Sequence, residues 1–215
     1  MVDGGSQDDT VARARAVGFE VVELNKKGRA VQINAGVLRA TNPIIWVLHA
    51  DTKPPIDAIS HIQSTMADQK TALAGFRAIL AGPDKVRWAT SFHNWIKTWY
   101  VPLLFRPHLF FRGGRLLFGD HAMFFRRQDF ISVGGCDPEV PIMEDAELCI
   151  KLVRLGRIRL LNKPVYTSDR RVAEWGSLKA NLIYFNVGLR WGLGFRQNLN
   201  RHYPDVRELD AIRTL

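Results

Sequence analysis

An unbroken apolar run, Ile44–Leu48, limits the folds open to this chain more than any other segment. Pro43 precedes the run and two prolines at 54–55 follow it soon after, so it has the length of a single strand. Such a run is typical of a strand that helices cover on both faces of a parallel sheet. We therefore expect Ile44–Leu48 to be a buried strand of such a sheet.

Helix and strand patterns alternate around this run. The segments that read as helices run between polar caps and glycine or proline stops, and they are residues 10–17, 28–40, 56–66, 144–155 and 177–193. Residues 19–24 and 122–125 read as short strands. This order predicts an α/β fold with an open, twisted, mostly parallel sheet flanked by helices, and ligands bound outside the carboxyl ends of the strands.

The charge of the chain is distributed unevenly. Its 215 residues, 47% of them hydrophobic, suffice for one domain or at most two small ones. Residues 1–84 carry nine basic and nine acidic side chains, so the whole net charge of +9 lies in residues 85–215. We expect this second part to face a phosphate-bearing ligand or an anionic surface.

Residues 85–118 combine basic and aromatic side chains, with six Lys or Arg, no Asp or Glu, and nine of the 22 aromatic residues. Helical spacing places four of the rings on one face, namely Trp88, Phe92, Trp95 and Trp99. Two interpretations are open: an interfacial helix that lies on an anionic membrane, or rings that pack as core. The apolar stretch at 98–105 is too short to cross a bilayer, which takes about 20 residues.

The two cysteines, Cys136 and Cys149, lie 13 positions apart without CxxC or paired-histidine spacing. This pattern indicates neither a zinc site nor a disulfide scaffold. No secretory signal is recognisable. We expect a reducing, cytoplasmic setting, either free in solution or peripheral on the inner face of the membrane.

Two residues lie where the Ile44–Leu48 strand is expected to open to solvent. Asp51 offers an exposed carboxylate, and Mg²⁺ typically takes one or two protein carboxylates and completes its shell with substrate phosphates. Asp51 is therefore a candidate metal ligand, with His49 as a candidate second ligand. A turn aspartate ahead of Pro54 and a packed histidine are the simpler interpretations of the same residues.

An acidic pair, Glu144 and Asp145, opens the expected helix at 144–155. The helix dipole and free backbone N–H groups favour negative charge there, so the pair needs no catalytic role. The loop before it could also present one carboxylate to a cleft as a general base. Adjacent acids in a low dielectric raise one pKa, which suits a proton acceptor near neutral pH.

Basic side chains occur at two further places. Arg29 begins the helix expected at 28–40 and shares it with Asn34, an arrangement suited to phosphate or base recognition. Arg170 and Arg171 could grip a departing diphosphate in bidentate fashion, although a solvated basic pair is the simpler interpretation.

Six segments, taken in order, resemble the motifs of glycosyltransferase family 2. They are Asp-Gly-Gly-Ser at 3–6, Gly-Arg-Ala with Gln, Asn and Gly at 28–36, His-Ala-Asp-Thr at 49–52, Gly-Asp at 119–120 with Phe-Arg-Arg at 125–127, Gly-Gly at 134–135, and Met-Glu-Asp at 143–145. The ordered set, which runs from residue 2 to about residue 176, is more specific than any one motif. It looks most like a bacterial subgroup whose metal motif reads His-Ala-Asp-Thr.

The resemblance implies a GT-A fold that binds a nucleotide-diphosphate sugar and Mg²⁺ or Mn²⁺, with an inverting single displacement by an acceptor hydroxyl. It implies that Asp51 holds the metal, with His49 in place of the motif's first acid. Asp145 matches the catalytic base, with Glu144 beside it. The residues expected to bind substrate are Asp3, Arg29, Asn34, Asp120, Arg170 and Arg171.

The resemblance also divides the chain. Residues 1–84 are expected to be the nucleotide-sugar half of a single GT-A domain, residues 85–176 the acceptor-binding and catalytic half, and residues 177–215 a C-terminal helical extension. Relatives have a strand, a loop and a helix before the Asp-Gly-Gly-Ser turn, so an N-terminally truncated domain is expected. A misplaced start, a fragment and a degenerate relative are three explanations of that difference.

A second hypothesis competes with the enzyme. The regional charge and the aromatic-basic segment at 85–118 also fit a non-catalytic module that binds a nucleotide or lies on an anionic membrane. Nucleic acid is not an expected partner, because no recognised binding motif accompanies the charge. The expected acceptor is either a lipid-linked compound or a small hydroxyl compound.

Overall fold

The computed structural model describes residues 1–140, 142–195 and 199–203. The strands in this part of the chain are β1 (Val2–Asp3), β2 (Val22–Glu23), β3 (Ile44–Trp46), β4 (Thr52–Lys53), β5 (Thr71–Ala81), β6 (Phe124–Arg126) and β7 (Arg157–Ser168). The α-helices are α1 (Thr10–Ala16), α2 (Arg29–Arg39), α3 (Ala58–Ala67), α4 (Trp88–Phe105), α5 (Pro107–Phe111), α6 (Arg127–Ser132), α7 (Glu144–Leu152), α8 (Arg170–Trp175) and α9 (Ser177–Gly192). Short 3₁₀ turns lie at Gly119–His121 and Leu199–His202.

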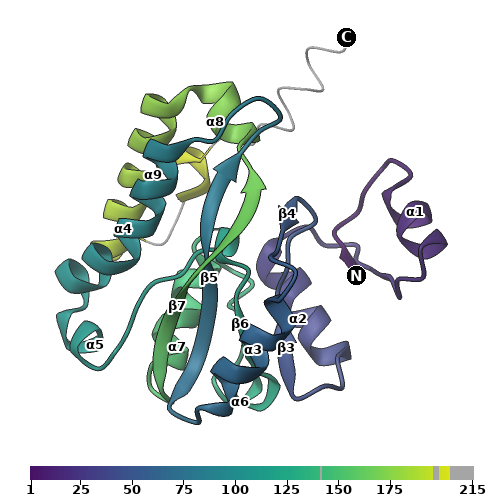
Figure 1. The fold of residues 1–215 in the computed structure, drawn as a ribbon, viewed down its shortest axis with the longest axis horizontal. Helices are drawn as coiled ribbons and strands as arrows, with labels where there is room; N and C mark the ends of the chain where they lie inside the picture. Colours follow the sequence, from purple (N-terminus) through teal and green to yellow (C-terminus); the bar gives the residue numbers. More distant parts are fainter. Residues whose placement is uncertain (141, 196–198, 204–215) are drawn as a thin grey trace.

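The main sheet has the strand order β3-β6-β5-β7-β4, with helices packed around it (Figure 1). Its longest ladder is parallel and joins β5 to β7, from Thr71 opposite Arg157 to Ala81 opposite Ser168. The shorter pairings β3–β6, β6–β5 and β4–β7 are antiparallel. The predicted α/β fold is confirmed, and its parallel pairing is concentrated in the central ladder and in the small sheet described next.

The first two strands form a sheet of their own. β1 and β2 pair in parallel, with Val2 opposite Val22, and have no ladder with the five-stranded sheet. The Gln32 side chain of α2 donates a hydrogen bond to the Val2 carbonyl over 3.2 Å, which ties β1 to that helix. Figure 1 shows β1 and α1 on the opposite side of the main sheet from α4 and α9.

The environment of the Ile44–Leu48 run corrects one expectation. β3 is the outer strand of the main sheet and is antiparallel to β6, instead of lying within a parallel sheet. The run is apolar at every position because Ile44 and Trp46 pack on one buried cluster while Ile45 and Val47 pack on another. Apolar cover on both faces therefore does not require parallel neighbours.

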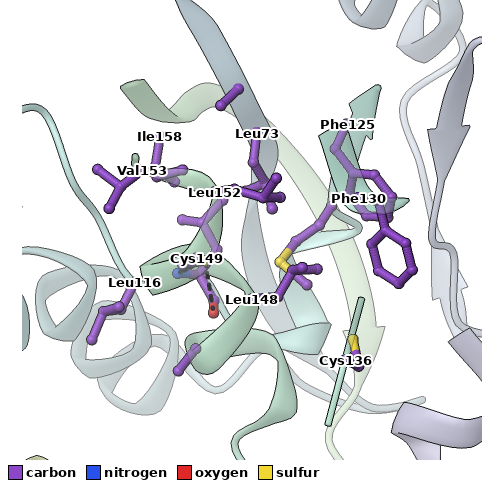
Figure 2. Close-up of a cluster of buried hydrophobic side chains, with 14 of the residues drawn as sticks. Leu73, Leu116, Phe125, Phe130, Cys136, Leu148, Cys149, Leu152, Val153 and Ile158 are labelled. Atoms are coloured by element: carbon purple, nitrogen blue, oxygen red, sulfur yellow. Dashed lines mark hydrogen bonds between the residues drawn. The ribbon is translucent and has the colours of Figure 1, made fainter. Parts of the chain in front are cut away.

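The larger core cluster surrounds α7. Figure 2 shows Leu148 and Leu152 of this helix among Leu73, Phe125 and other buried side chains. Each of these four side chains is fully buried. This packing fixes the axis of α7 and therefore the position of the acidic pair at its first turn. Both cysteines lie in this cluster as free thiols.

Helices α4 and α9 lie side by side, as Figure 1 shows, and α4 also packs on β5. The predicted aromatic stripe of α4 is exposed, at 66%, 59%, 37% and 38% for Trp88, Phe92, Trp95 and Trp99. The alternative that these rings pack as core is therefore wrong. Four apolar residues of α9 are also exposed, namely Leu178, Leu182, Phe185 and Leu189.

The carboxyl ends of β5 and β7 lead into α4 and α8 at one edge of the sheet. An ion pair of 2.5 Å joins Arg87, just before α4, to Asp169, just before α8. The Leu80 amide donates a hydrogen bond to the Ser91 hydroxyl over 2.9 Å. These contacts fix both helices beside the site described below. In the described part of the chain, we find no helix with the length and hydrophobicity needed to span a membrane.

Candidate functional site

The Asp145 carboxylate is held from three directions. Its Oδ2 accepts hydrogen bonds from the Gly119 amide and, over 3.1 Å, from Arg29 Nη2. Its Oδ1 accepts one from the Ala146 amide over 2.8 Å. An ionised carboxylate has about four acceptor sites, and these three contacts leave one of them, on Oδ1. The residue is only 4% exposed, so the remaining acceptor site belongs to a fixed, nearly buried group.

Glu144 lies behind Asp145 and is fully buried. Arg29 Nε lies 2.8 Å from its Oε1, in an ion pair that lacks hydrogen-bond alignment. Burial and the charge of Asp145 raise the pKa of Glu144 to about 7, although Arg29 opposes that shift. Glu144 can therefore take up a proton near neutrality.

Gly119 allows Arg29 to reach the acidic pair. A methyl group on Gly119 would lie 1.8 Å from Arg29 Nη2 and 2.7 Å from His49 Cε1. Burial alone would lower the pKa of Arg29, but the charges of Glu144, Asp145 and Asp120 hold it above its ordinary value. The guanidinium is therefore a permanent cation beside two carboxyl groups.

The predicted metal residues lie at the end of β3. His49 packs against Gly119, and burial and the charge of Arg29 lower its pKa, so the ring is neutral near pH 7 and has a lone pair to offer. Asp51 is exposed in the turn that follows. Within the described residues, no three His, Cys, Asp or Glu side chains gather closely enough to enclose a metal. One imidazole and one carboxylate fit a metal that is shared with a substrate, not one caged by protein alone.

A cavity of about 190 Å³ runs between α4 and α9 to this site, and we call it the α4–α9 cavity. Arg29, Gly119, Asp120 and Asp145 line one end, while Glu144 does not line it. The walls come largely from apolar side chains of the two helices. The cavity can therefore hold an organic molecule beside the Asp145 carboxylate.

The structure brings several predicted residues together and keeps others apart. Arg29, Asp120, Asp145 and Arg171 all line the α4–α9 cavity, with His49 against Gly119 at its end. Arg170 is exposed and does not line this cavity. The two arginines of the predicted basic pair therefore have different environments.

The side chains of Asp3 and Asn34 are engaged in hydrogen bonds with other groups of the protein. The Asp3 carboxylate accepts hydrogen bonds from the Ser6 hydroxyl, the Ser6 amide and the Gly5 amide at 2.6, 2.9 and 2.8 Å, and the bonds from Ser6 lower its pKa. The Asn34 side chain bonds both the carbonyl and the amide of Cys136, at 2.8 and 2.9 Å. These contacts shape the turn after β1 and join α2 to the loop before α7.

Sequence reasoning missed two polar residues of α4. Asn94 and Lys97 line the α4–α9 cavity, on the side of the helix away from the aromatic stripe. Their spacing of three places them on one helical face, together with Thr90 and Val101. A polar pair opposite an exposed aromatic stripe was the signal that could have identified them.

Comparisons with known proteins fit this geometry. The sequence model described as "Glycosyl transferase family 2" matches residues 1–134. A search of curated proteins finds no match.

Three solved structures have a similar fold. Glucosyl-3-phosphoglycerate synthase from Mycobacterium tuberculosis superposes with a TM-score of 0.63 and 18% identity, covering 92% of this chain and 69% of that one. The mannosyltransferase PcManGT from Pyrobaculum calidifontis gives 0.62 and 18%, covering 87% and 52%. TarS from S. aureus gives 0.57 and 14%, covering 79% and 48%, so the chain spans about half the length of these last two structures.

These findings agree with the ordered motifs in the sequence. The likeness to the solved structures establishes the GT-A type of α/β fold, and the family match extends over well more than half of the chain. The acidic pair of α7 and the arginine of α2 meet beside one end of the α4–α9 cavity. The chain belongs to glycosyl transferase family 2.

Proposed function

We propose that this protein transfers a sugar, with inversion, from a nucleotide-diphosphate donor to an acceptor hydroxyl, and that Asp145 is the general base. The observation that carries the proposal is the Asp145 carboxylate, which lines the α4–α9 cavity and has one acceptor site beyond those used by its three protein donors. Family membership supports the same chemistry. The solved relatives were crystallised with UDP-glucose, GDP-mannose or UDP-GlcNAc, which supports a donor of this class.

The proposed step is a single displacement. The acceptor oxygen forms a bond to the anomeric carbon of the sugar as the bond from that carbon to the diphosphate breaks. The hydroxyl proton passes to Oδ1 of Asp145, and the electron pair of the broken bond leaves with the diphosphate. Gly119, Ala146 and Arg29 keep the carboxylate oriented during this transfer. Glu144 positions Arg29 from behind.

A divalent ion completes the proposal. Mg²⁺ or Mn²⁺ would stabilise the negative charge that develops on the departing diphosphate. Asp51 and His49 are the residues that would hold it, because one is an exposed carboxylate and the other a neutral imidazole. Solved structures of similar fold that contain Mn²⁺ or Mg²⁺ together with UDP support the use of a divalent ion.

The remaining substrate residues, apart from Arg171, keep the roles predicted from sequence. We propose that Arg29 acts on the charge of the donor, because it lines the cavity beside Asp145. Arg171 lines the same cavity on the side of Tyr203, so we assign it to the acceptor instead of to the departing diphosphate that the sequence predicted. Asp3, Asn34, Asp120 and Arg170 stay predictions for donor binding. The division into a nucleotide-sugar half at 1–84, a catalytic half at 85–176 and a helical extension from 177 is likewise proposed.

A second property concerns the exposed apolar side chains of α4 and α9, which we propose lie on an anionic membrane. They are Trp88, Phe92, Trp95, Trp99, Leu178, Leu182, Phe185 and Leu189. Neither residues 85–118 nor residues 175–195 contain an acidic side chain, while both contain basic ones. Exposed rings and aliphatic side chains beside unopposed positive charge suit an anionic interface.

The transferase proposal is tested with a panel of nucleotide sugars, Mn²⁺ and a panel of hydroxyl acceptors, measuring release of the nucleoside diphosphate. We expect Asp145→Asn to abolish release and Asp51→Ala to weaken binding of the nucleotide in the presence of Mn²⁺. Asp84→Asn is the matched control, because Asp84 is exposed and does not line the α4–α9 cavity. Equal release by all four proteins would contradict the assigned roles.

The membrane proposal is tested by flotation with phosphatidylglycerol vesicles and with phosphatidylcholine vesicles. We expect the protein to float with the anionic vesicles at low salt, and less at high salt. The double variant Phe92→Ser/Leu182→Ser should stay unbound, whereas Ile59→Ser, an exposed apolar residue of α3, should float like the wild type. Absence of flotation by the wild type would overturn the proposal.

A further inference from the structure

The inner wall of the α4–α9 cavity has polar groups without a hydrogen-bond partner in the part of the chain that the structure describes. Asn94 is only 5% exposed, and neither its amide nitrogen nor its amide oxygen has a hydrogen-bond partner among the described residues. The Nε of Arg171 is also buried without a partner there, although its Nη1 donates to the Tyr203 hydroxyl over 2.9 Å. Buried polar groups of folded proteins are nearly always satisfied, so these groups point to a bound molecule.

Lys97 lies one helical turn beyond Asn94. Its Nζ is 3.9 Å from the centroid of the Phe118 ring, and no carboxylate oxygen of the described residues comes within 4 Å of it. The ammonium therefore contacts a ring face instead of an acid. A cation in this position is available to an anionic group that enters the cavity.

The balance of charge inside the cavity supports the same conclusion. The carboxylates near Lys97 are Asp120 and Asp145, and Arg29 already pairs with Asp145. Among the lining residues, this leaves Asp120 opposite two cations, Lys97 and Arg171. An additional negative charge from a ligand would balance the second of these two cations.

We propose that Asn94, Lys97 and Arg171 form a subsite for an anionic group, a phosphate or a carboxylate, carried by the acceptor. This inference rests on the proposed function, because it assumes that the same cavity presents the acceptor hydroxyl to Asp145. Asn94 contributes amide donors, and Lys97 and Arg171 contribute charged donors to the anion. The substrate class is therefore an anionic hydroxyl compound, not a neutral sugar alone.

Two sources could supply such an anion. Leu104, Phe185 and Leu189 line the cavity and are also 67%, 51% and 37% exposed, so its rim is apolar. A lipid head group could enter across this rim, and a small phosphate ester could enter from solution. The chemistry that binds Asn94, Lys97 and Arg171 is the same in both cases.

Isothermal titration calorimetry on the full chain tests the subsite. The probes are glycerol 3-phosphate for a soluble ester, dioctanoyl phosphatidic acid below its micellar concentration for a lipid, and glycerol as the neutral reference. We expect the wild type to bind at least one phosphate probe and not glycerol. Lys97→Met and Asn94→Leu should each weaken that binding about tenfold or more, and Lys97→Arg should retain most of it.

Controls separate this inference from the transferase proposal. Lys179→Met, at an exposed lysine of α9 outside the cavity, should bind the probe like the wild type. Binding of UDP with Mn²⁺ should be unchanged in Lys97→Met, and its absence from the wild type would count against the proposed function alone. Unchanged probe binding in Lys97→Met, equal weakening in Lys179→Met, or no binding of either phosphate probe to the wild type would overturn the subsite. Thermal unfolding of each variant confirms that it is folded.

Discussion

The two ends of the α4–α9 cavity differ in how their polar groups are satisfied. At the end formed by α7 and α2, the Asp145 carboxylate has three protein donors and Glu144 has an arginine. On the wall formed by α4, Asn94 has no hydrogen-bond partner in the described part of the chain, and Lys97 faces a ring. The first region is therefore organised by the protein itself, whereas the second requires a ligand. Preorganisation of the groups that act on the reacting atoms increases the rate, whereas groups that select a substrate do not need it.

The largest expected effect comes from Asp145→Asn, at the end of the cavity formed by α7 and α2. This substitution keeps the size of the side chain but removes the proton acceptor. We expect kcat to fall by about 10²–10⁴-fold, the usual contribution of a general base, with nucleotide binding little changed. Steady-state kinetics together with titration of UDP measure the two effects. A variant that loses nucleotide binding but keeps kcat would show that Asp145 serves the donor instead.

A second change disturbs the same end without removing any polar group. Gly119→Ala would place a methyl group where Arg29 Nη2 and His49 lie, so Arg29 must leave Asp145. We expect a fall in kcat on the order of 10²-fold, because a displacement of about 1 Å near the reacting atoms can cost that much. The melting temperature should change by only a few degrees, because Arg29 can move into solvent. Wild-type kinetics in Gly119→Ala would refute the importance of the Arg29–Asp145 contact.

The α4 wall is tested by pH. Burial lowers the pKa of Lys97 to about 8, while Asp120 and Asp145 oppose that shift. Affinity for glycerol 3-phosphate should therefore fall above about pH 8, approaching tenfold per pH unit, as the ammonium loses its proton. The phosphate is already fully ionised there, since its second pKa is about 6. Titrations of Lys97→Arg should stay flat up to pH 10, and an equal decline in that variant would exclude Lys97 as the cause.

The smallest expected effect concerns stability. The pKa of Glu144 is raised to about 7, so between about pH 4.5 and 7 the folded state holds a proton that the unfolded state has lost. Stability from this group is present at low pH and is lost as pH rises through that window. Glu144→Gln should flatten the decline, by on the order of 1–3 kcal/mol between pH 5 and pH 8.

Urea unfolding of both proteins at pH 5 and pH 8 measures this effect. Other titrating groups are common to the two proteins, so the difference between them isolates Glu144. An identical change with pH in the wild type and in Glu144→Gln would contradict the raised pKa. It would also indicate that Arg29 fully neutralises Glu144 in the folded protein.

The sequence could predict which residues come together at much of the site, because these residues belong to short local motifs. The motifs around Arg29, His49 and Asp145 lie at helix starts or strand ends, and an α/β fold brings such positions to one edge of the sheet. Their contacts through Gly119 depend on a close approach that spacing alone does not reveal. The roles of these residues stay predictions until the variants are measured.

Other features depend on tertiary pairing and could not be predicted. The apolar run of β3 is compatible with a parallel or an antiparallel neighbour, and only its register with β6 decides between them. The aromatic stripe of α4 has the same helical spacing whether it faces core or solvent. The sequence pattern places Asn94 and Lys97 opposite the aromatic stripe, but that they line a cavity follows only from the packing of α9 against α4.

The most direct test of the central claim is the anomeric configuration of the first product formed from the donor and acceptor that give turnover. Proton NMR of the reaction at early times gives this configuration. A single displacement with Asp145 as the base predicts a configuration opposite to that of the donor sugar. A product that retains the donor configuration would contradict the account, because it requires a second displacement or a different attack on the anomeric carbon.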